Sequence, residues 1–114
     1  MDIPDDVDFI EILGVAPESM ENDQDIWRVD IPIENAQIVT LSFDIGARSV
    51  RLAKGSETRS EVDIYREQVE RILLYTGNGE RGIIVECDVP GFKCELRVVV
   101  HPEFRLTDPM LYVG

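Results

Sequence analysis

From residue 27 onward, hydrophobic and polar residues alternate in one stretch after another, and turn-forming residues separate the stretches. Strict alternation places the hydrophobic side chains of a strand on one face of a sheet. Stretches that recur about every ten residues are typical of antiparallel sandwiches and barrels. We therefore expect a mainly β chain, folded as a single antiparallel sandwich or barrel-like domain of about seven strands with a short N-terminal helix.

The clearest pair of strands lies on the two sides of Pro90-Gly91. If the chain folds back symmetrically there, every inward pair is apolar: Val89 with Phe92, Cys87 with Cys94, Val85 with Leu96 and Ile83 with Val98. Pro-Gly favours a type II turn, whose twist does not suit a tight hairpin, so we expect a wider loop of about four residues. This register predicts that the two cysteines face each other in the core, where they act as small hydrophobic residues; a redox pair is the alternative.

A second hairpin is predicted around Gly46-Ala47. Glycine at the first central position suits a type II′ turn. Closing that turn places Phe43 opposite Val50 and Leu41 opposite Leu52, so the apolar residues again meet on one face.

Residues 60–76 fit two structures. The segment has a hydrophobic helical face and a capping-box pattern at its start, which together describe a helix near 60–73 packed on the sheet, an α+β fold. Strands at 61–65 and 69–76 instead preserve the spacing of the other stretches. We favour the strands and keep the helix as the alternative.

The N-terminal part has a different character. Helical spacing of its apolar residues and a Gly14 stop predict a short helix near 4–13, although Phe9 and Ile12 also allow a strand. Residues 18–25 are polar enough for an exposed connector. The 114 residues suffice for one structural domain. Within it we distinguish an acidic N-terminal segment and connector (1–25) from a β-rich part (26–114).

The formal net charge of −12 is concentrated in residues 1–25, which hold nine acidic residues and no Lys or Arg. Such a surface repels phosphates and anionic lipids, so we expect no direct nucleic-acid or membrane binding, and a basic protein as partner. The candidate partner-binding residues are the acids of this segment and the only tryptophan beside them: Asp5, Asp6, Asp8, Glu11, Glu21, Asp23, Asp25 and Trp27.

Other motifs in the chain give no catalytic or cofactor site. Gly77-Asn78-Gly79-Glu80-Arg81-Gly82 matches a phosphate-binding fingerprint, but a strand pattern follows it where a helix is required, so we interpret it as a hairpin loop. Two cysteines and the single His101 do not make a zinc site or a nucleophile–base pair. We expect no cofactor, no bound metal and no enzymatic activity.

A small acidic domain without a catalytic set resembles the immunity proteins of bacterial toxin–immunity pairs. The resemblance is one of class, in size, charge and absence of chemistry, and it carries no motif. It implies a cytoplasmic, non-enzymatic protein that occludes a basic toxin, such as a nuclease, whose phosphate-binding surface would meet the acidic segment. The lack of a secretory signal agrees with a cytoplasmic location. The alternatives are an accessory or structural protein-interaction domain and a nucleic-acid-mimicking inhibitor of another machine.

Overall fold

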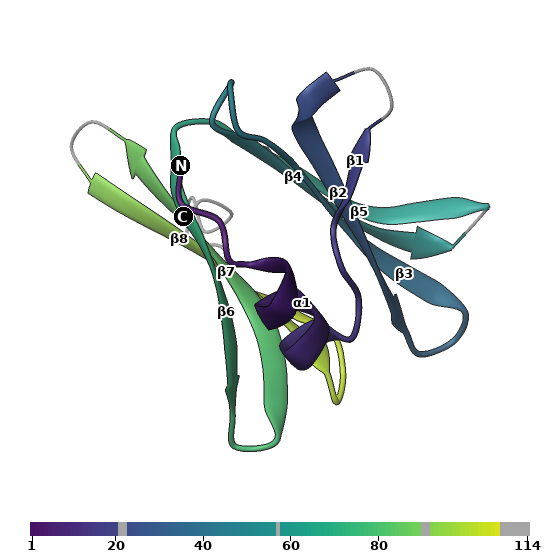
Figure 1. Ribbon diagram of the computed structural model, residues 1–114. Coiled ribbons are helices and arrows are strands. Elements are labelled where there is room, and N and C mark those ends of the chain that lie inside the picture. Colours follow the sequence, from purple (N-terminus) through teal and green to yellow (C-terminus); the bar gives the residue numbers. More distant parts are fainter. Residues whose placement is uncertain (21–22, 57, 90–91, 108–114) are drawn as a thin grey trace.

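The computed structural model describes residues 1–20, 23–56, 58–89 and 92–107. Within these ranges one helix, α1 (Asp6–Leu13), precedes two antiparallel sheets (Figure 1). The large sheet holds, in spatial order, β1 (Glu18–Met20), β2 (Asp23–Ile33), β3 (Gln37–Asp44), β4 (Ser49–Ser56) and β5 (Arg59–Arg66). The small sheet holds β6 (Val69–Gly77), β7 (Glu80–Val89), β8 (Phe92–His101) and β9 (Arg105–Thr107).

The mainly β, antiparallel fold predicted from the sequence is confirmed. The two sheets stay separate and do not close into a barrel, and the described residues form nine strands where we expected about seven. In Figure 1 the sheets splay apart like a V, and α1 lies between them. No helix of the described ranges has the length and apolar character needed to cross a membrane.

The core lies between the inward faces of the two sheets. Its buried side chains come from seven strands, at alternate positions except across the register shift of β6, and from one position of α1: Phe9, Val29, Ile31, Val39, Leu41, Phe43, Val50, Leu52, Ile64, Val69, Ile72, Ile83, Val85, Cys87, Cys94, Leu96, Val98 and Val100. Period-2 patterning therefore decides which residues are buried, as the alternation predicted.

The register predicted for the hairpin of β7 and β8 is confirmed. Cys87 pairs with Cys94, Val85 with Leu96 and Ile83 with Val98. Both cysteines are buried and carry thiols, not a disulfide. The register shifts between Arg81 and Gly82, which symmetric pairing does not include. The Pro90-Gly91 loop lies outside the described residues.

The hairpin of β3 and β4 has the predicted register but a different turn. Phe43 pairs with Val50 and Leu41 with Leu52. The type II′ turn is wrong, because the positive φ that it needs at Gly46 is found instead at Arg48, at 54°. The connection is a wider turn after Asp44, whose Oδ1 accepts a hydrogen bond from the backbone N–H of Ala47 at 3.0 Å. A side-chain acceptor thus decides the turn type.

Residues 60–76 form strands, so the alternative helix near 60–73 is wrong. Ile64 is buried at 8% exposure while its neighbour Tyr65 is 53% exposed, which is the period of a strand. A helix with the predicted apolar face would have buried Tyr65. Gln68, with a φ of 56°, makes the turn between β5 and β6.

The connector expected at residues 18–25 is also wrong. Glu18–Met20 form β1, which pairs antiparallel with the start of β2, and Ser19 lies opposite Trp27. All three residues of β1 are exposed, so this edge strand needs no hydrophobic alternation and resembles a loop in sequence. The short helix is confirmed at Asp6–Leu13, and Gly14 ends it with a φ of 79°.

The glycine-rich segment after β6 is a hairpin turn, as predicted, and not a phosphate-binding loop. Asn78 and Gly79 have φ values of 54° and 75°, which are those of a type I′ turn. Gly77 and Glu80 close the hairpin on either side.

Leu96→Ala should lower the free energy of unfolding by about 2–5 kcal/mol, through lost transfer energy and a residual cavity. Leu96 is 2% exposed and lies between the sheets. Urea denaturation measures the change, and Leu73→Ala, at a position with 38% exposure, is the control. A loss well under about 1 kcal/mol would contradict the burial of this face.

Gly79→Ala should destabilise the protein by about 1–2 kcal/mol, because alanine must adopt a left-handed backbone at this position. A Cβ at Gly79 would meet no atom within 4 Å, so the cost is conformational and not steric. Gly77→Ala is the matched control, since Gly77 has equal space and no positive φ. Thermal unfolding should separate the two variants, and equal midpoints would contradict the type I′ turn.

Candidate partner-binding site

Helix α1 is held against the sheets by one aromatic side chain. Phe9 is fully buried, and its ring stacks on that of Phe43 with centroids 6.4 Å apart and an interplanar angle of 6°. Leu13 packs against the same core. The remaining residues of the helix are therefore displayed on the surface in a fixed orientation.

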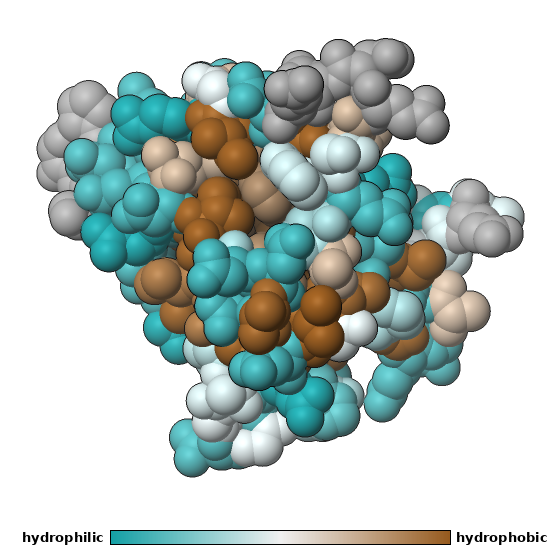
Figure 2. All heavy atoms as spheres, viewed as in Figure 1, coloured by the Kyte–Doolittle hydropathy of each residue, from teal (hydrophilic) through white to brown (hydrophobic). Residues whose placement is uncertain are grey.

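The displayed face of α1 is both acidic and apolar. Val7 and Ile10 are 61% and 53% exposed, and Asp6, Asp8 and Glu11 are exposed beside them. Within the described part of the chain, none of these three carboxylates forms an ion pair, and α1 itself carries no Lys or Arg. Figure 2 shows hydrophobic and hydrophilic residues side by side over this helix.

Some carboxylates elsewhere on the surface are engaged by arginine or lysine. Arg51 holds Asp63 through two hydrogen bonds of 2.8 and 2.5 Å, and these lower the pKa of that carboxyl group. Lys54 donates to Glu61 at 2.9 Å, and this hydrogen bond is the main cause of the lowered pKa of Glu61. The acids of α1 therefore differ from these in having no cation of the described chain beside them.

An apolar hollow of about 180 Å³ opens beside the first turn of α1, between that turn and the ends of β2 and β3. We call it the Trp27 hollow. Six of its seven lining residues are apolar and the seventh is an aspartate: Ile3, Pro4, Asp6, Pro17, Trp27, Phe43 and Ile45. Ile45 is 39% exposed at its rim. The fold thus joins the acidic helix to an apolar surface from the large sheet.

A second hollow, of about 410 Å³, lies on the other side of the same turn, against β6. We call it the Leu73 hollow. Its lining also combines first-turn acid with apolar side chains: Asp2, Ile3, Pro4, Asp8, Ile12, Ile72, Leu73 and Leu74. Ile3 and Pro4 line both hollows and separate them.

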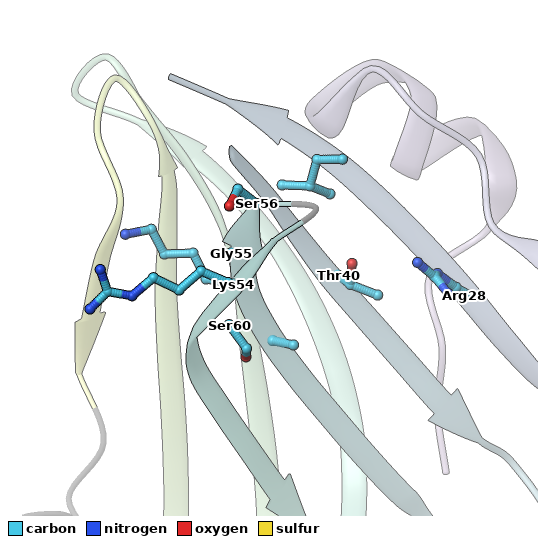
Figure 3. Close-up of a pocket in the computed structure, with 9 residues that line it drawn as sticks. Arg28, Thr40, Lys54, Gly55, Ser56 and Ser60 are labelled. Carbon is cyan, nitrogen blue, oxygen red and sulfur yellow. The ribbon is translucent and has the colours of Figure 1, made fainter. Parts of the chain in front are cut away.

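Another hollow, of about 310 Å³, lies over strands β2 to β5 (Figure 3). Arg28 and Lys54 lie on opposite sides of it. Each of them forms an ion pair with a carboxylate of the same chain. Arg28 and Thr40 both donate to Asp30 at 2.9 Å, and Lys54 pairs with Glu61. Arg28 and Lys54 are thus paired within the protein, whereas Arg59, which also lines this hollow, forms no ion pair among the described residues.

The structure brings part of the predicted set together. Asp5, Asp6, Asp8 and Glu11 lie on or next to α1, and Asp6 and Trp27 line one hollow although 21 positions separate them. Asp25 belongs to β2 and lies beside the β3–β4 turn, where its backbone carbonyl accepts a hydrogen bond from the N–H of Ile45 at 2.9 Å. Asp23 begins β2, with its side chain outside the described part, and Glu21 lies outside the described residues.

Sequence reasoning missed the apolar residues that complete the site. These residues come from three segments that meet only in the folded chain: Ile3 and Pro4, Pro17, and Ile45. The one signal that the sequence offers is Ile45, an apolar residue placed where the β3 strand pattern gives way to a turn.

The residues considered for catalysis or metal binding do not form such a site. Cys87 and Cys94 are 2% and 5% exposed between the sheets, whereas His101 is exposed at the end of β8. Among the residues that the structure describes, no three His, Cys, Asp or Glu side chains are grouped as metal ligands.

No protein-family model and no curated protein matches the sequence. In fold, the chain is similar to a chain of the contact-dependent growth inhibition toxin–immunity protein complex from Klebsiella pneumoniae 342. The TM-score is 0.80 at 12% sequence identity, and the match covers 93% of each chain. At this identity the likeness shows the fold, and it agrees with the resemblance of class that the sequence indicated.

Phe9→Ala should lower the free energy of unfolding by about 3–5 kcal/mol, because it removes the ring that fastens α1. Val7→Ala, at an exposed position of the same helix, is the control and should change stability by less than about 1 kcal/mol. Chemical denaturation measures both variants. Equal effects of the two substitutions would contradict the docking of α1 through Phe9.

Proposed function

We propose that this chain is an immunity-type protein that binds a toxin and occludes its working surface. The observation that carries the proposal is the likeness of fold to a chain of a toxin–immunity complex, which extends over almost the whole of both chains. A binding surface with unpaired acids and exposed apolar side chains on α1 supports the same function.

The charge distribution favours a basic toxin. Residues 1–25 carry nine of the acidic side chains and no base, and the fold leaves the acids of α1 exposed, with Asp6 and Asp8 on opposite sides of its first turn. A field of this kind attracts a positive surface and accelerates encounter at low salt. A nuclease fits this description, since its own substrate-binding surface must be basic to hold phosphates.

A non-enzymatic role agrees with the placement of the reactive groups. The two thiols are buried between the sheets, where no substrate reaches them, and His101 lies on the surface away from them. We propose a cytoplasmic site of action, as the resemblance to immunity proteins implies.

The test of the function is neutralisation of a toxin encoded in the gene beside this one. Co-expression of this chain should restore growth of cells that produce the toxin, and the two purified proteins should form a complex. A toxin that remains lethal and does not bind this chain would overturn the proposal.

Replacing Asp5, Asp6 and Asp8 with Asn should slow association with that toxin about tenfold at low salt, because long-range attraction acts on encounter. The difference should shrink at high salt, where the field is screened, and dissociation should change less. Surface plasmon resonance with a catalytically inactive toxin measures both rates.

A matched control removes equal charge from elsewhere on the molecule. Glu34→Gln, Glu67→Gln and Glu103→Gln alter exposed residues in three turns outside α1. This control should slow association much less than the α1 variant. Equal association rates for the two triple variants would contradict a specific role of α1, and the acids would then act through net charge alone.

A further inference from the structure

The Trp27 hollow has a composition that charge steering does not explain. Six of its seven lining residues are apolar, and two of these, Trp27 and Phe43, are aromatic. Trp27 is only partly buried and packs against the core from the rim of the large sheet. Aromatic residues at the surface are enriched among the residues that dominate binding energy in interfaces.

The size of the hollow suits one apolar side chain. Its volume is about 180 Å³. An apolar cavity of about 150 Å³ inside a protein is large enough to take up benzene. A phenylalanine or leucine side chain from a partner would therefore fill the space against Trp27 and Ile45 and remove their apolar surface from water.

The charged side chains that the structure places at this hollow are aspartates. Asp6 is part of its wall and lies at the positive end of α1, with no ion pair in the described chain. At the far rim, a Cβ on Gly46 would stand 2.8 Å from Oδ2 of Asp25 and 3.5 Å from Oδ1 of Asp44, so both carboxylates border this turn. An apolar group entering here is thus met by aspartates at both ends of the opening.

We propose that the Trp27 hollow receives one phenylalanine or leucine side chain of the bound toxin, flanked on the toxin by arginine or lysine. The apolar side chain fills the hollow, and the flanking cation pairs with Asp6. This inference rests on the proposed function and adds to it the chemistry of the toxin surface that this chain recognises. The hollow supplies the short-range part of recognition and the acids supply the long-range part.

The two parts have different kinetic signatures, which makes the inference testable. Loss of an apolar contact made only in the complex raises the dissociation rate, whereas loss of an exposed charge lowers the association rate. Ile45→Ser removes the apolar rim of the hollow without changing charge. Ile38→Ser is the matched control, because Ile38 is 40% exposed against 39% for Ile45 and lies on β3 outside the hollow.

With the inactive toxin from the neighbouring gene, Ile45→Ser should raise the dissociation rate about tenfold and leave association unchanged. Ile38→Ser should match wild type in both rates. Asp6→Asn should lower the association rate and reduce its salt dependence. Circular dichroism and thermal unfolding establish that the three variants are folded.

A second readout follows the hollow itself. The chain has one tryptophan, so 5-fluorotryptophan gives a single ¹⁹F resonance that belongs to position 27. This resonance should shift when the toxin binds wild type. In the Ile45→Ser complex the shift should be smaller.

Binding with an unshifted ¹⁹F resonance, or equal dissociation rates for Ile45→Ser and Ile38→Ser, would overturn the hollow as the docking point while leaving the proposed function intact. A raised dissociation rate for Leu73→Ser but not for Ile45→Ser would also overturn it, in favour of the Leu73 hollow. Failure of wild type to bind the toxin would overturn both proposals.

Discussion

The proposed binding surface depends on how the N-terminal segment is attached to the two sheets. At one end, the N–H of Asp2 donates to the carbonyl of Glu70 at 3.0 Å, and the N–H of Ile72 donates to the carbonyl of Asp2 at 2.9 Å, which ties the chain to the edge of β6. At the other end, Phe9 stacks on Phe43 of β3. One attachment is to the small sheet and the other to the large one, so the residues between them span the opening. This placement of the segment forms one wall of each hollow and positions the acids of α1 beside them.

The acidity of this segment has an energetic consequence that the two attachments must offset. Like charges crowded on one short helix repel each other, and no base of the described chain pairs with the carboxylates of α1 to relieve that repulsion. Two of them, Asp6 and Asp8, stand in the first turn, where the helix dipole favours negative charge by about 0.3–1 kcal/mol each. Burial of Phe9 contributes more than these electrostatic effects. An acidic surface can therefore be kept ready for a partner without unfolding the helix that carries it.

What the sequence could and could not predict follows from the range of the interactions concerned. The pairing of Cys87 with Cys94 is predictable because alternation fixes which face each residue occupies, and a slip by one residue would expose the whole strand. The type of turn after Asp44 is not predictable in this way, because it depends on a single hydrogen bond from the N–H of Ala47 to the Asp44 side chain. β1 is not predictable either, since an exposed edge strand needs no hydrophobic pattern. The acids of α1 were found from charge alone, but their meeting with Trp27 and Ile45 depends on the tertiary fold.

The acidic face and the apolar hollow would contribute differently to recognition of a single partner, the first to the rate of association and the second to selectivity. An acidic face attracts every basic surface that it meets, including those of proteins that should be left alone, so charge alone gives speed without discrimination. In the proposed recognition, a hollow walled by Trp27, Phe43 and Ile45 accepts a phenylalanine or leucine side chain, and a partner that presents a polar or larger group there gains nothing from burial. Because Asp6 is part of the wall of this hollow, a partner must present its positive charge and its apolar side chain at the same point of the surface. A basic protein without the apolar side chain would arrive quickly and leave quickly, while the cognate partner would arrive at a similar rate and remain bound.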